Sequence, residues 1–401
     1  MTTKSAKTAK TATEINIPLG EDLPEIREAI RRICADYPLN YWLEMEEKDE
    51  YPHAFVNTMT EAGFLATLIP ESYGGAGLSF RAAGVILEEV MACGGNSAMI
   101  HAQMYTMGSV LRHGSDEMKQ RYLPELAAGK LRLQAFGVTE PTSGSDTTSL
   151  RTSAVRKGDH YVVNGQKIWT SRARQSDLML LLARTTPRDA VSKKTDGISV
   201  FLVDMREAVG NGMTIRPLKA FINHQTNEVF FDNLKIPADS LVGEEGKGFR
   251  YILSGMNSER ILVAHSSIGA ARWFINTAVK YANEREVFGR PIGQNQGIQF
   301  PIADAYSKMI AADLMVRKSV SLFDAGLETG EDANLSRLLA SEANWAAAEA
   351  CFQTHGGFAA AKEYHVERRW REARLGRIAP VSHNLVLAHI AEHVLGMPRS
   401  Y

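Results

Sequence analysis

The sequence has few of the features that mark secreted, membrane-spanning and nucleic-acid-binding proteins. Only three of its 401 residues are cysteines, and this odd, scattered set argues against a disulfide framework: Cys34, Cys93 and Cys351. No apolar run approaches the length of a membrane span. The 45 basic and 46 acidic residues give a net charge of -1, which provides no electrostatic footprint for nucleic acid or an anionic membrane. We therefore expect a globular protein of a reducing compartment, with neither nucleic acid nor membrane as a partner.

The first residues, MTTKSAKTAKTATE, lack the apolar core of a secretory signal. They also lack arginine, so a flexible tail over residues 1–21 is favoured over a mitochondrial presequence. We expect a cytoplasmic protein, or one of the mitochondrial matrix if its source is eukaryotic.

The chain also lacks an alternating series of predicted strands and helices, and no GxGxxG motif follows a predicted strand, which argues against a Rossmann nucleotide site. Three regions are present instead. Residues 22–130 have apolar positions at helical spacing, 131–245 contain short runs rich in β-branched and aromatic residues, and 246–401 are helical again. These regions predict an α+β fold: an N-terminal helical domain, a middle antiparallel β domain and a C-terminal helical bundle.

Finer features follow from turn chemistry and periodicity. Asn164 and Gly165 lie between two strand-like runs, as in a hairpin. In the last region, leucine, isoleucine and alanine recur at three- and four-residue spacing, which predicts helices near 249–284, 294–327, 332–355 and 381–396.

Two stretches of the middle region could bind a polar, planar ligand. GVTEPTSGSD (residues 137–146) leaves a strand and offers backbone N–H groups and hydroxyls, although composition alone favours a surface turn. KIWTS (167–171) places a tryptophan beside two hydroxyl residues. Its indole is either part of a core or stacked on a cofactor whose polar edge Thr170 or Ser171 binds.

Two stretches of the last region have similar alternatives. NEREVFGRPIGQNQ (283–296) carries Arg285 and Arg290 at a helix junction, where arginine either complements the helix dipole or binds a pyrophosphate. QTHGGFAAAKEY (353–364) places two glycines at a helix end, as a C-cap or as bare backbone beside a phosphate or adenine.

The segment His389-Ile-Ala-Glu392-His393 fits the HxxEH pattern of inverted zinc proteases. The motif is short and no third ligand is evident. Ordinary helix histidines are therefore the favoured interpretation, and no metal site is predicted.

Together, and in this order, the four stretches resemble the acyl-CoA dehydrogenase family, from about residue 22 to the C-terminus. The resemblance implies FAD as the cofactor and an acyl-CoA as the substrate. It implies that FAD is bound by Phe136, Val138, Thr139, Ser145, Trp169, Thr170, Ser171, Arg285, Phe288, Gln296, Gln353, Gly356, Gly357, Ser382 and Asn384. It assigns the substrate to Ser145, Asn257 and Arg260. Since a neighbouring subunit completes the FAD site in this family, it also implies a homo-oligomer, commonly a tetramer.

The sequence departs from the family pattern at two places. Ala359 stands where the signature usually has a final glycine, so that one extra methyl is present. Pro380 aligns with the glutamate that many members use as their catalytic base, and proline cannot accept a proton.

The stretch NSERILVAHSSIG (257–269) provides a carboxylate elsewhere. Glu259 matches the base of the isovaleryl-CoA and long-chain branches, which carry it on the first long helix of the C-terminal domain. The competing interpretation is a first-turn glutamate that complements the helix dipole. Gly255, Val263 and Ser266 share its helical face and would leave space for an acyl chain.

The resemblance implies α,β-dehydrogenation of an acyl-CoA to the trans-2-enoyl-CoA, with Glu259 removing the α-proton, hydride passing to flavin N5 and an electron-transfer flavoprotein as acceptor. Three alternatives stay open: an acyl-CoA oxidase, a non-oxidising elimination on an acyl-CoA, and a catalytically silent flavoprotein. Neither the length nor the branching of the acyl chain follows from the sequence.

Overall fold

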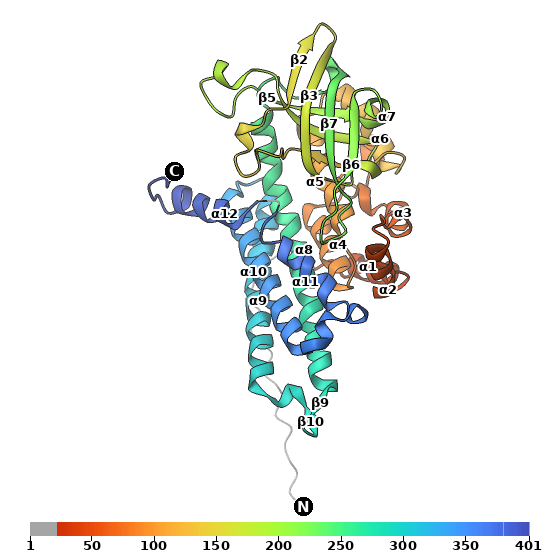
Figure 1. Cartoon of the computed structure of the whole chain (residues 1–401), viewed down its shortest axis with the longest axis vertical. Coiled ribbons are helices and arrows are strands. Elements are labelled where there is room, and N and C mark those ends of the chain that lie inside the picture. Colours follow the sequence, from red (N-terminus) through yellow and green to blue (C-terminus); the bar gives the residue numbers. More distant parts are fainter. Residues whose placement is uncertain (1–21, 380, 401) are drawn as a thin grey trace, which may run out of the picture.

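The computed structural model describes residues 22–379 and 381–400, which fold into three successive regions (Figure 1). The predicted α+β architecture is confirmed. The predicted tail and Pro380 lie outside the described residues.

The N-terminal region is helical. Its α-helices are α1 (Pro24–Ala35), α2 (Leu39–Glu47), α3 (His53–Glu61), α4 (Phe80–Ala92), α5 (Ala98–His113) and α6 (Asp116–Ala127). Ser79 caps α4 and Ser115 caps α6, each accepting a hydrogen bond from a backbone N–H in the first turn.

The middle region is one eight-stranded sheet with strand order β6-β7-β3-β2-β4-β5-β8, and β1 pairs with β4. The strands and one short helix are β1 (Leu133–Gly137), β2 (Ser153–Lys157), β3 (His160–Ser171), β4 (Leu178–Arg184), β5 (Ile198–Asp204), α7 (Met205–Ala208), β6 (Met213–Pro217), β7 (Thr226–Pro237) and β8 (Leu241–Val242). Most pairs are antiparallel, while β4 runs parallel to β1 and β2. All seven β4 residues are buried because alternate side chains enter two different cores.

The predicted hairpin turn at Asn164 and Gly165 is wrong. Both residues lie inside β3, at a bulge in its pairing with β7, and the chain reverses at Gly158 and Asp159 instead. Gly165 has φ 147°, and a Cβ there would approach the Thr152 hydroxyl to 2.5 Å. The glycine therefore serves a bulge and a close backbone approach, not a turn.

The C-terminal region is a helical bundle. Its elements are α8 (Gly248–Glu284), β9 (Glu286–Val287), β10 (Arg290–Pro291), α9 (Gln296–Asp324), α10 (Gly330–His355), α11 (Val366–Leu375) and α12 (His383–His389). With 37 residues, α8 is about 55 Å long. It runs from the β domain to the β9–β10 hairpin at the opposite end of the molecule (Figure 1).

Close packing fixes α8 against the N-terminal helices. A Cβ at Gly269 would lie 1.9 Å from the Glu88 carbonyl oxygen, so only glycine allows this contact with α4. Glu88 is buried and forms ion pairs with Arg27 of α1 and Arg272 of α8. Helices α1 and α4 of the N-terminal region therefore hold α8, and with it Glu259, in place.

Candidate active site

A cavity of ≈ 220 Å³ lies where α5, α8, α10 and α11 meet the end of β3 and the loop 218–225. Its wall is unusually rich in ionisable groups: His101, Tyr105, Arg172, His224, Glu259, Arg369 and Glu372. These side chains come from five separate segments of the chain, which the fold brings together.

Glu259 is the twelfth residue of α8, which begins at Gly248, so the first-turn interpretation of this glutamate is wrong. Glu259, Val263, Ser266 and Ala270 follow helical spacing and line the cavity together. On another face of the helix, Ile261 and Leu262 are fully buried in the N-terminal core.

Three other residues from this part of the sequence lie outside the cavity lining. Gly255 does not line the cavity, because its Cα faces Arg112 and Ser109 of α5. Asn257 and Arg260 also lie outside the cavity lining, and the Arg260 guanidinium donates a 3.0 Å hydrogen bond to the Asn257 side chain. Their predicted contact with the substrate stays a prediction.

Burial changes the acidity of Glu259. Glu259 is only 6% exposed, and desolvation raises the pKa of its carboxyl group to about 7. The positive charges of Arg260 and Arg337 oppose this rise. Arg337, from α10, donates hydrogen bonds to the carbonyls of Gly376 and Ala379, just before Pro380. The cavity therefore contains a carboxyl group that exchanges a proton near neutral pH.

His101 and Tyr105 lie one turn apart on α5 and face the same cavity. Burial, followed by the charge of Arg172, lowers the pKa of His101 to about 3, although a hydrogen bond to the backbone of Glu259 opposes this shift. Burial and the charge of Glu259 raise the pKa of the Tyr105 hydroxyl. Both groups are therefore neutral at physiological pH.

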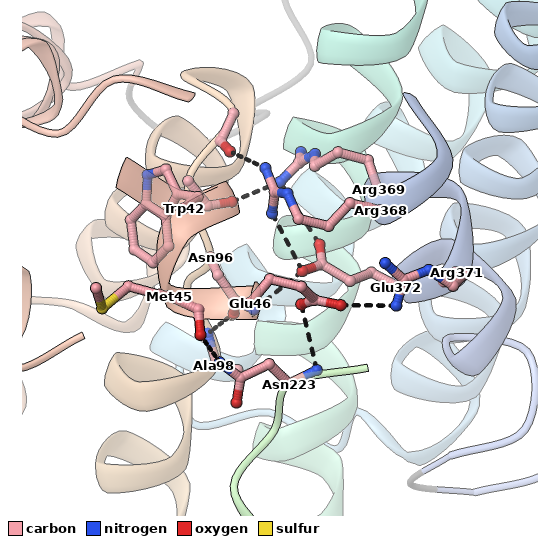
Figure 2. Close-up of polar contacts among 12 residues, drawn as sticks. Trp42, Met45, Glu46, Asn96, Ala98, Asn223, Arg368, Arg369, Arg371 and Glu372 are labelled. Atoms are coloured by element: carbon pink, nitrogen blue, oxygen red, sulfur yellow. Dashed lines mark hydrogen bonds and ion pairs between the residues drawn. The ribbon is translucent and has the colours of Figure 1, made fainter. Parts of the chain in front are cut away.

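The far wall of the cavity is held by arginines of α11 (Figure 2). Arg369 donates hydrogen bonds to the carbonyls of Met91 and Gly95, at the α4–α5 junction. Glu372 accepts a 3.2 Å hydrogen bond from Asn96 at the same junction. These contacts hold α11 against the start of α5 and close this side of the cavity.

The loop that carries His224 is held by a second set of contacts, also drawn in Figure 2. Arg371 pairs with Glu46 of α2 at 2.6 Å and donates to the Phe221 carbonyl. The Asn223 side chain donates a 2.9 Å hydrogen bond to the Met45 carbonyl. Three regions of the chain thus fix the position of His224.

The GVTEPTSGSD loop lies directly after β1 and is braced by a buried ion pair. Lys167, on β3, donates to Glu140 at 2.8 Å and to the Val138 carbonyl at 3.0 Å. Glu140 also accepts hydrogen bonds from the backbone N–H groups of Arg151 and Thr152. Burial lowers the pKa of Lys167 to about 8, against the opposing effect of Glu140.

The end of β3 presents an open aromatic surface. The Trp169 indole is 57% exposed on a backbone with φ 61°, so it is not part of a core in this chain. The Thr170 hydroxyl is buried without a hydrogen-bond partner among the described residues. The Ser171 hydroxyl reaches that of Thr226 at 3.5 Å. The uncovered indole and the half-buried Ser171 hydroxyl fit the ring and polar edge of a flavin, whereas Thr170 is fully buried and its hydroxyl is not accessible to a ligand.

A second group of predicted FAD residues lies at the opposite end of α8. Arg285 follows its last residue, and the Arg285 guanidinium lies 5.6 Å from the Phe358 ring centroid. Phe288 is fully exposed in the β9–β10 turn. Gln353 and Gly356 end α10, and space beside both Gly356 and Gly357 is open.

One chain does not bring these two groups together. Arg285 lies 26 residues after Glu259 on a straight helix, a separation of about 39 Å. Gln296 begins α9 near the same hairpin, whereas Ser382 caps α12 and Asn384 lies exposed in its first turn. Ser145 is exposed on the loop 137–146.

Two expectations concern single residues of the bundle. Ala359, the departure from the glycine pattern, is fully buried in the bundle core, which accommodates its methyl group. The rings of His389 and His393 lie 4.8 Å apart. Throughout 22–379 and 381–400, no group of three or more His, Cys, Asp or Glu side chains is arranged to hold a metal ion.

Sequence reasoning missed six ionisable groups on the cavity wall: His101, Tyr105, Arg172, His224, Arg369 and Glu372. The i, i+4 spacing of His101 and Tyr105 on a predicted helix was a usable signal, as was the position of Arg172 directly after the KIWTS segment. No local pattern marks His224.

Comparison with known proteins agrees with this architecture. Three family models match in order: "Acyl-CoA dehydrogenase, N-terminal domain" at residues 20–130, "Acyl-CoA dehydrogenase, middle domain" at 135–234 and "Acyl-CoA dehydrogenase, C-terminal domain" at 246–395. The acyl-CoA dehydrogenase FadE12 of Mycobacterium tuberculosis is 33% identical over 384 residues, which cover 95% of this chain and 98% of the relative.

Solved structures show the same fold. The glutaryl-coenzyme A dehydrogenase glutaryl-CoA complex superposes with a TM-score of 0.89 at 30% identity, covering 97% of this chain and 98% of the other. A structure described as the electron transferring flavoprotein of Acidaminococcus fermentans gives 0.88 at 28% identity, covering 96% and 100%.

Fold and site together define an FAD-dependent flavoprotein oxidoreductase. The chain belongs to the acyl-CoA dehydrogenase family, and the resemblance stated from its motifs is confirmed. It is an acyl-CoA dehydrogenase with FAD as its cofactor. No helix in the described part of the chain is both long and apolar enough to cross a membrane.

Proposed function

We propose that this enzyme converts an acyl-CoA to the trans-2-enoyl-CoA, with Glu259 as the base that removes the α-proton. The observation that carries the proposal is a desolvated carboxyl group on the cavity wall, with its pKa raised to about 7. General bases work best when their pKa lies near the operating pH. The cavity also has room beside Glu259, since Val263, Ser266 and Ala270 are short side chains.

The remaining steps depend on FAD and on the cavity walls. When bound, FAD accepts at its N5 the hydride that leaves the β-carbon. Glu259 holds the α-proton after transfer, and the charges of Arg260 and Arg337 stabilise its ionised form before it. Neutral His101 and Tyr105 bound the same space without adding charge.

For the cofactor, we propose that one subunit supplies the flavin surface and a second supplies the distal residues. Phe136, Val138, Trp169 and Ser171 belong to the first surface, and Arg285 to the second. The separation of about 39 Å along α8 supports this division, because one FAD molecule cannot reach both groups in one chain. The proposal requires a homo-oligomer, and a tetramer is typical of the family.

We propose an electron-transfer flavoprotein as the electron acceptor. The support is the structural neighbour that is described as such a flavoprotein. Prompt reoxidation of the reduced enzyme by an electron-transfer flavoprotein, together with slow reoxidation by oxygen, separates this proposal from an acyl-CoA oxidase.

An anaerobic titration tests the proposed reaction. The purified holoprotein is mixed with acyl-CoAs of varied length and branching while the oxidised flavin absorbance is followed. Bleaching by one chain class is expected, and Glu259→Gln should slow it by about 10³-fold because the amide cannot accept the proton. Enoyl-CoA is measured as the product.

Glu284→Gln is the matched control, since Glu284 is an exposed glutamate at the far end of the same helix. It should bleach at the parent rate. If Glu259→Gln also bleached at the parent rate, Glu259 would not be the base. If FAD were bound and no thioester bleached it, a non-oxidising or silent flavoprotein would be the better description.

A further inference from the structure

One arginine on the cavity wall lacks the partners that buried arginines normally have. Arg172 is 7% exposed, and its Nε has no hydrogen-bond partner among residues 22–379 and 381–400. Among the described residues, the charges that act on its guanidinium are those of Tyr105 and Tyr51, and neither is a carboxylate. A buried cation without a counter-ion destabilises the protein, so its retention calls for an explanation.

Other buried arginines show how such a charge is usually compensated. Arg27 forms ion pairs with Glu88 and Glu89 at 3.0 and 2.9 Å. Arg369, on the same cavity wall as Arg172, donates to two backbone carbonyls and lies 3.7 Å from Glu372. The Nε of Arg369 is unpartnered too, but its terminal nitrogens have acceptors, whereas no side-chain hydrogen bond or ion pair of Arg172 is found within 22–379 and 381–400.

The backbone at Arg172 is also unusual. It has φ 59°, a left-handed conformation that a non-glycine residue adopts at an energetic cost. Its N–H donates a 2.7 Å hydrogen bond to the Gln225 carbonyl, which ties the end of β3 to the loop that carries His224. Strained residues held by surrounding contacts cluster at ligand sites.

The neighbours of Arg172 cannot neutralise it. Burial lowers the pKa of His224 to about 3, and the charge of Arg172 contributes to this shift. His101 is affected by burial and by Arg172 in the same way. Both imidazoles are neutral, and the Tyr105 hydroxyl stays protonated because burial raises its pKa. The region around Arg172 thus has one positive charge and several neutral polar groups.

Glu259 lines the same cavity as Arg172. The charges of Glu259 and Arg172 act in opposite directions on the hydroxyl of Tyr105, so both reach this one side chain from the cavity wall. A substrate beside the base therefore also comes within the field of the guanidinium.

We infer that Arg172 binds a carboxylate on the acyl group, so that the substrate is the mono-CoA thioester of a dicarboxylic acid. Guanidinium and carboxylate form short, charge-assisted hydrogen bonds, and the bound carboxylate provides the counter-ion that the chain lacks. His101, Tyr105 and His224 offer further polar contacts around it. This inference rests on the proposed function, because it specifies the chemical group at the end of the acyl chain of the same acyl-CoA substrate.

Equilibrium binding to the holoprotein tests the inference. The measurements use a Glu259→Gln background, in which the proposed reaction is blocked, and follow the perturbation of the oxidised flavin spectrum. Succinyl-, glutaryl- and adipyl-CoA are compared with butanoyl-, pentanoyl- and hexanoyl-CoA, so that each pair has the same number of carbons. At least one dicarboxylic thioester is expected to bind about tenfold or more tightly than its match.

Adding Arg172→Gln should weaken that preferred thioester at least about thirtyfold and leave its uncharged match unchanged or tighter. Arg174→Gln is the control, because Arg174 is an exposed arginine two residues away. It should leave the preference intact. The flavin midpoint potential is measured in each variant and should not move.

Equal binding of both thioesters in each pair, or an equal loss for both in Arg172→Gln, would overturn the inference while the proposed dehydrogenation stood. A shifted flavin potential with an unchanged preference would assign Arg172 to the flavin and overturn it as well. If no acyl-CoA bound at all, the proposed function itself would fail.

Discussion

The two ends of helix α8 present two kinds of candidate site. Around Glu259 the polar groups are buried, and the pKa values of Glu259, His101 and His224 are all shifted from their ordinary values. Around Arg285 and Phe288 the side chains are exposed. One end is a cavity lined by buried ionisable groups of a single chain, while the other is exposed surface.

Under the proposed division of the FAD site between two subunits, one chain completes the first of these sites and provides only half of the second. Desolvation perturbs ionisable groups, so an enclosed site is visible from its burial and electrostatics. In a site that needs a second subunit, the side chains of one chain alone are still solvated. Burial therefore does not reveal such a site. What remains visible is an unfavourable feature that no contact within the chain offsets. The fully exposed Phe288 ring, on a backbone with φ 54°, is an example.

The largest effect is expected where a charge is buried, at the ion pair that braces the loop 137–146. Lys167→Met removes the partner of Glu140, which is itself buried, and should lower the free energy of unfolding by about 3–5 kcal/mol. Chemical denaturation of the apoprotein measures the change.

Lys130→Met is the matched control, because Lys130 pairs with Glu125 on the exposed surface at 3.1 Å. It should change the free energy of unfolding by no more than about 1 kcal/mol. Adding Glu140→Gln to Lys167→Met should recover part of the loss, since no unpaired carboxylate then remains. Equal losses from the buried and the exposed lysine would refute the distinction drawn between the two environments.

A pH profile tests the enclosed end next. The pKa of Glu259 is raised by burial to about 7, so the base is increasingly ionised as the pH rises toward that value. The second-order rate constant for flavin reduction should therefore rise about tenfold per pH unit below about 7 and level off above it. Stopped-flow absorbance measures this rate constant. A rate constant that does not change between about pH 5 and about pH 8, from about two units below this pKa to about one unit above it, would contradict the assignment.

The same shift has a consequence for stability. The folded protein keeps a proton on Glu259 that the unfolded chain releases above 4.5, so the free energy of unfolding falls as the pH rises from 4.5 to about 7. In Glu259→Gln this part of the pH dependence should disappear, which distinguishes Glu259 from other titrating groups.

The sequence predicts the fold and the positions of helices well, because long amphipathic segments such as α8 and α10 carry their periodicity over many turns. It fails at Gly165, where a glycine that serves a bulge looks like one that serves a turn. It also misses α11, which closes the cavity.

For the site, sequence motifs identify Glu259 and the aromatic surface at Trp169. They do not identify Arg172 as exceptional, because what distinguishes this arginine is that no carboxylate of the described residues pairs with it. The absence of a partner is a property of the packed chain, which no local pattern records. His224 reaches the cavity only through contacts of its loop with α2 and α11.

The smallest effect is expected at the exposed end of α8, where a substitution at Phe288 should change the affinity for FAD but not the stability of the apoprotein. Phe288→Asn removes an exposed ring and places a residue that tolerates the left-handed backbone. The melting temperature of the apoprotein should therefore stay the same or rise slightly. If Phe288 stacks on the adenosine of an FAD bound to a neighbouring subunit, the FAD dissociation constant should rise about tenfold, as expected for the loss of one stacked base.

Leu327→Ser provides the comparison, since Leu327 is 58% exposed in the turn between α9 and α10, away from the predicted FAD residues. It should leave FAD affinity unchanged. If Phe288→Asn bound FAD as tightly as the parent, the exposed ring would have no part in the cofactor site. If it instead lowered the melting temperature of the apoprotein, Phe288 would have a structural role that its exposure in one chain does not reveal.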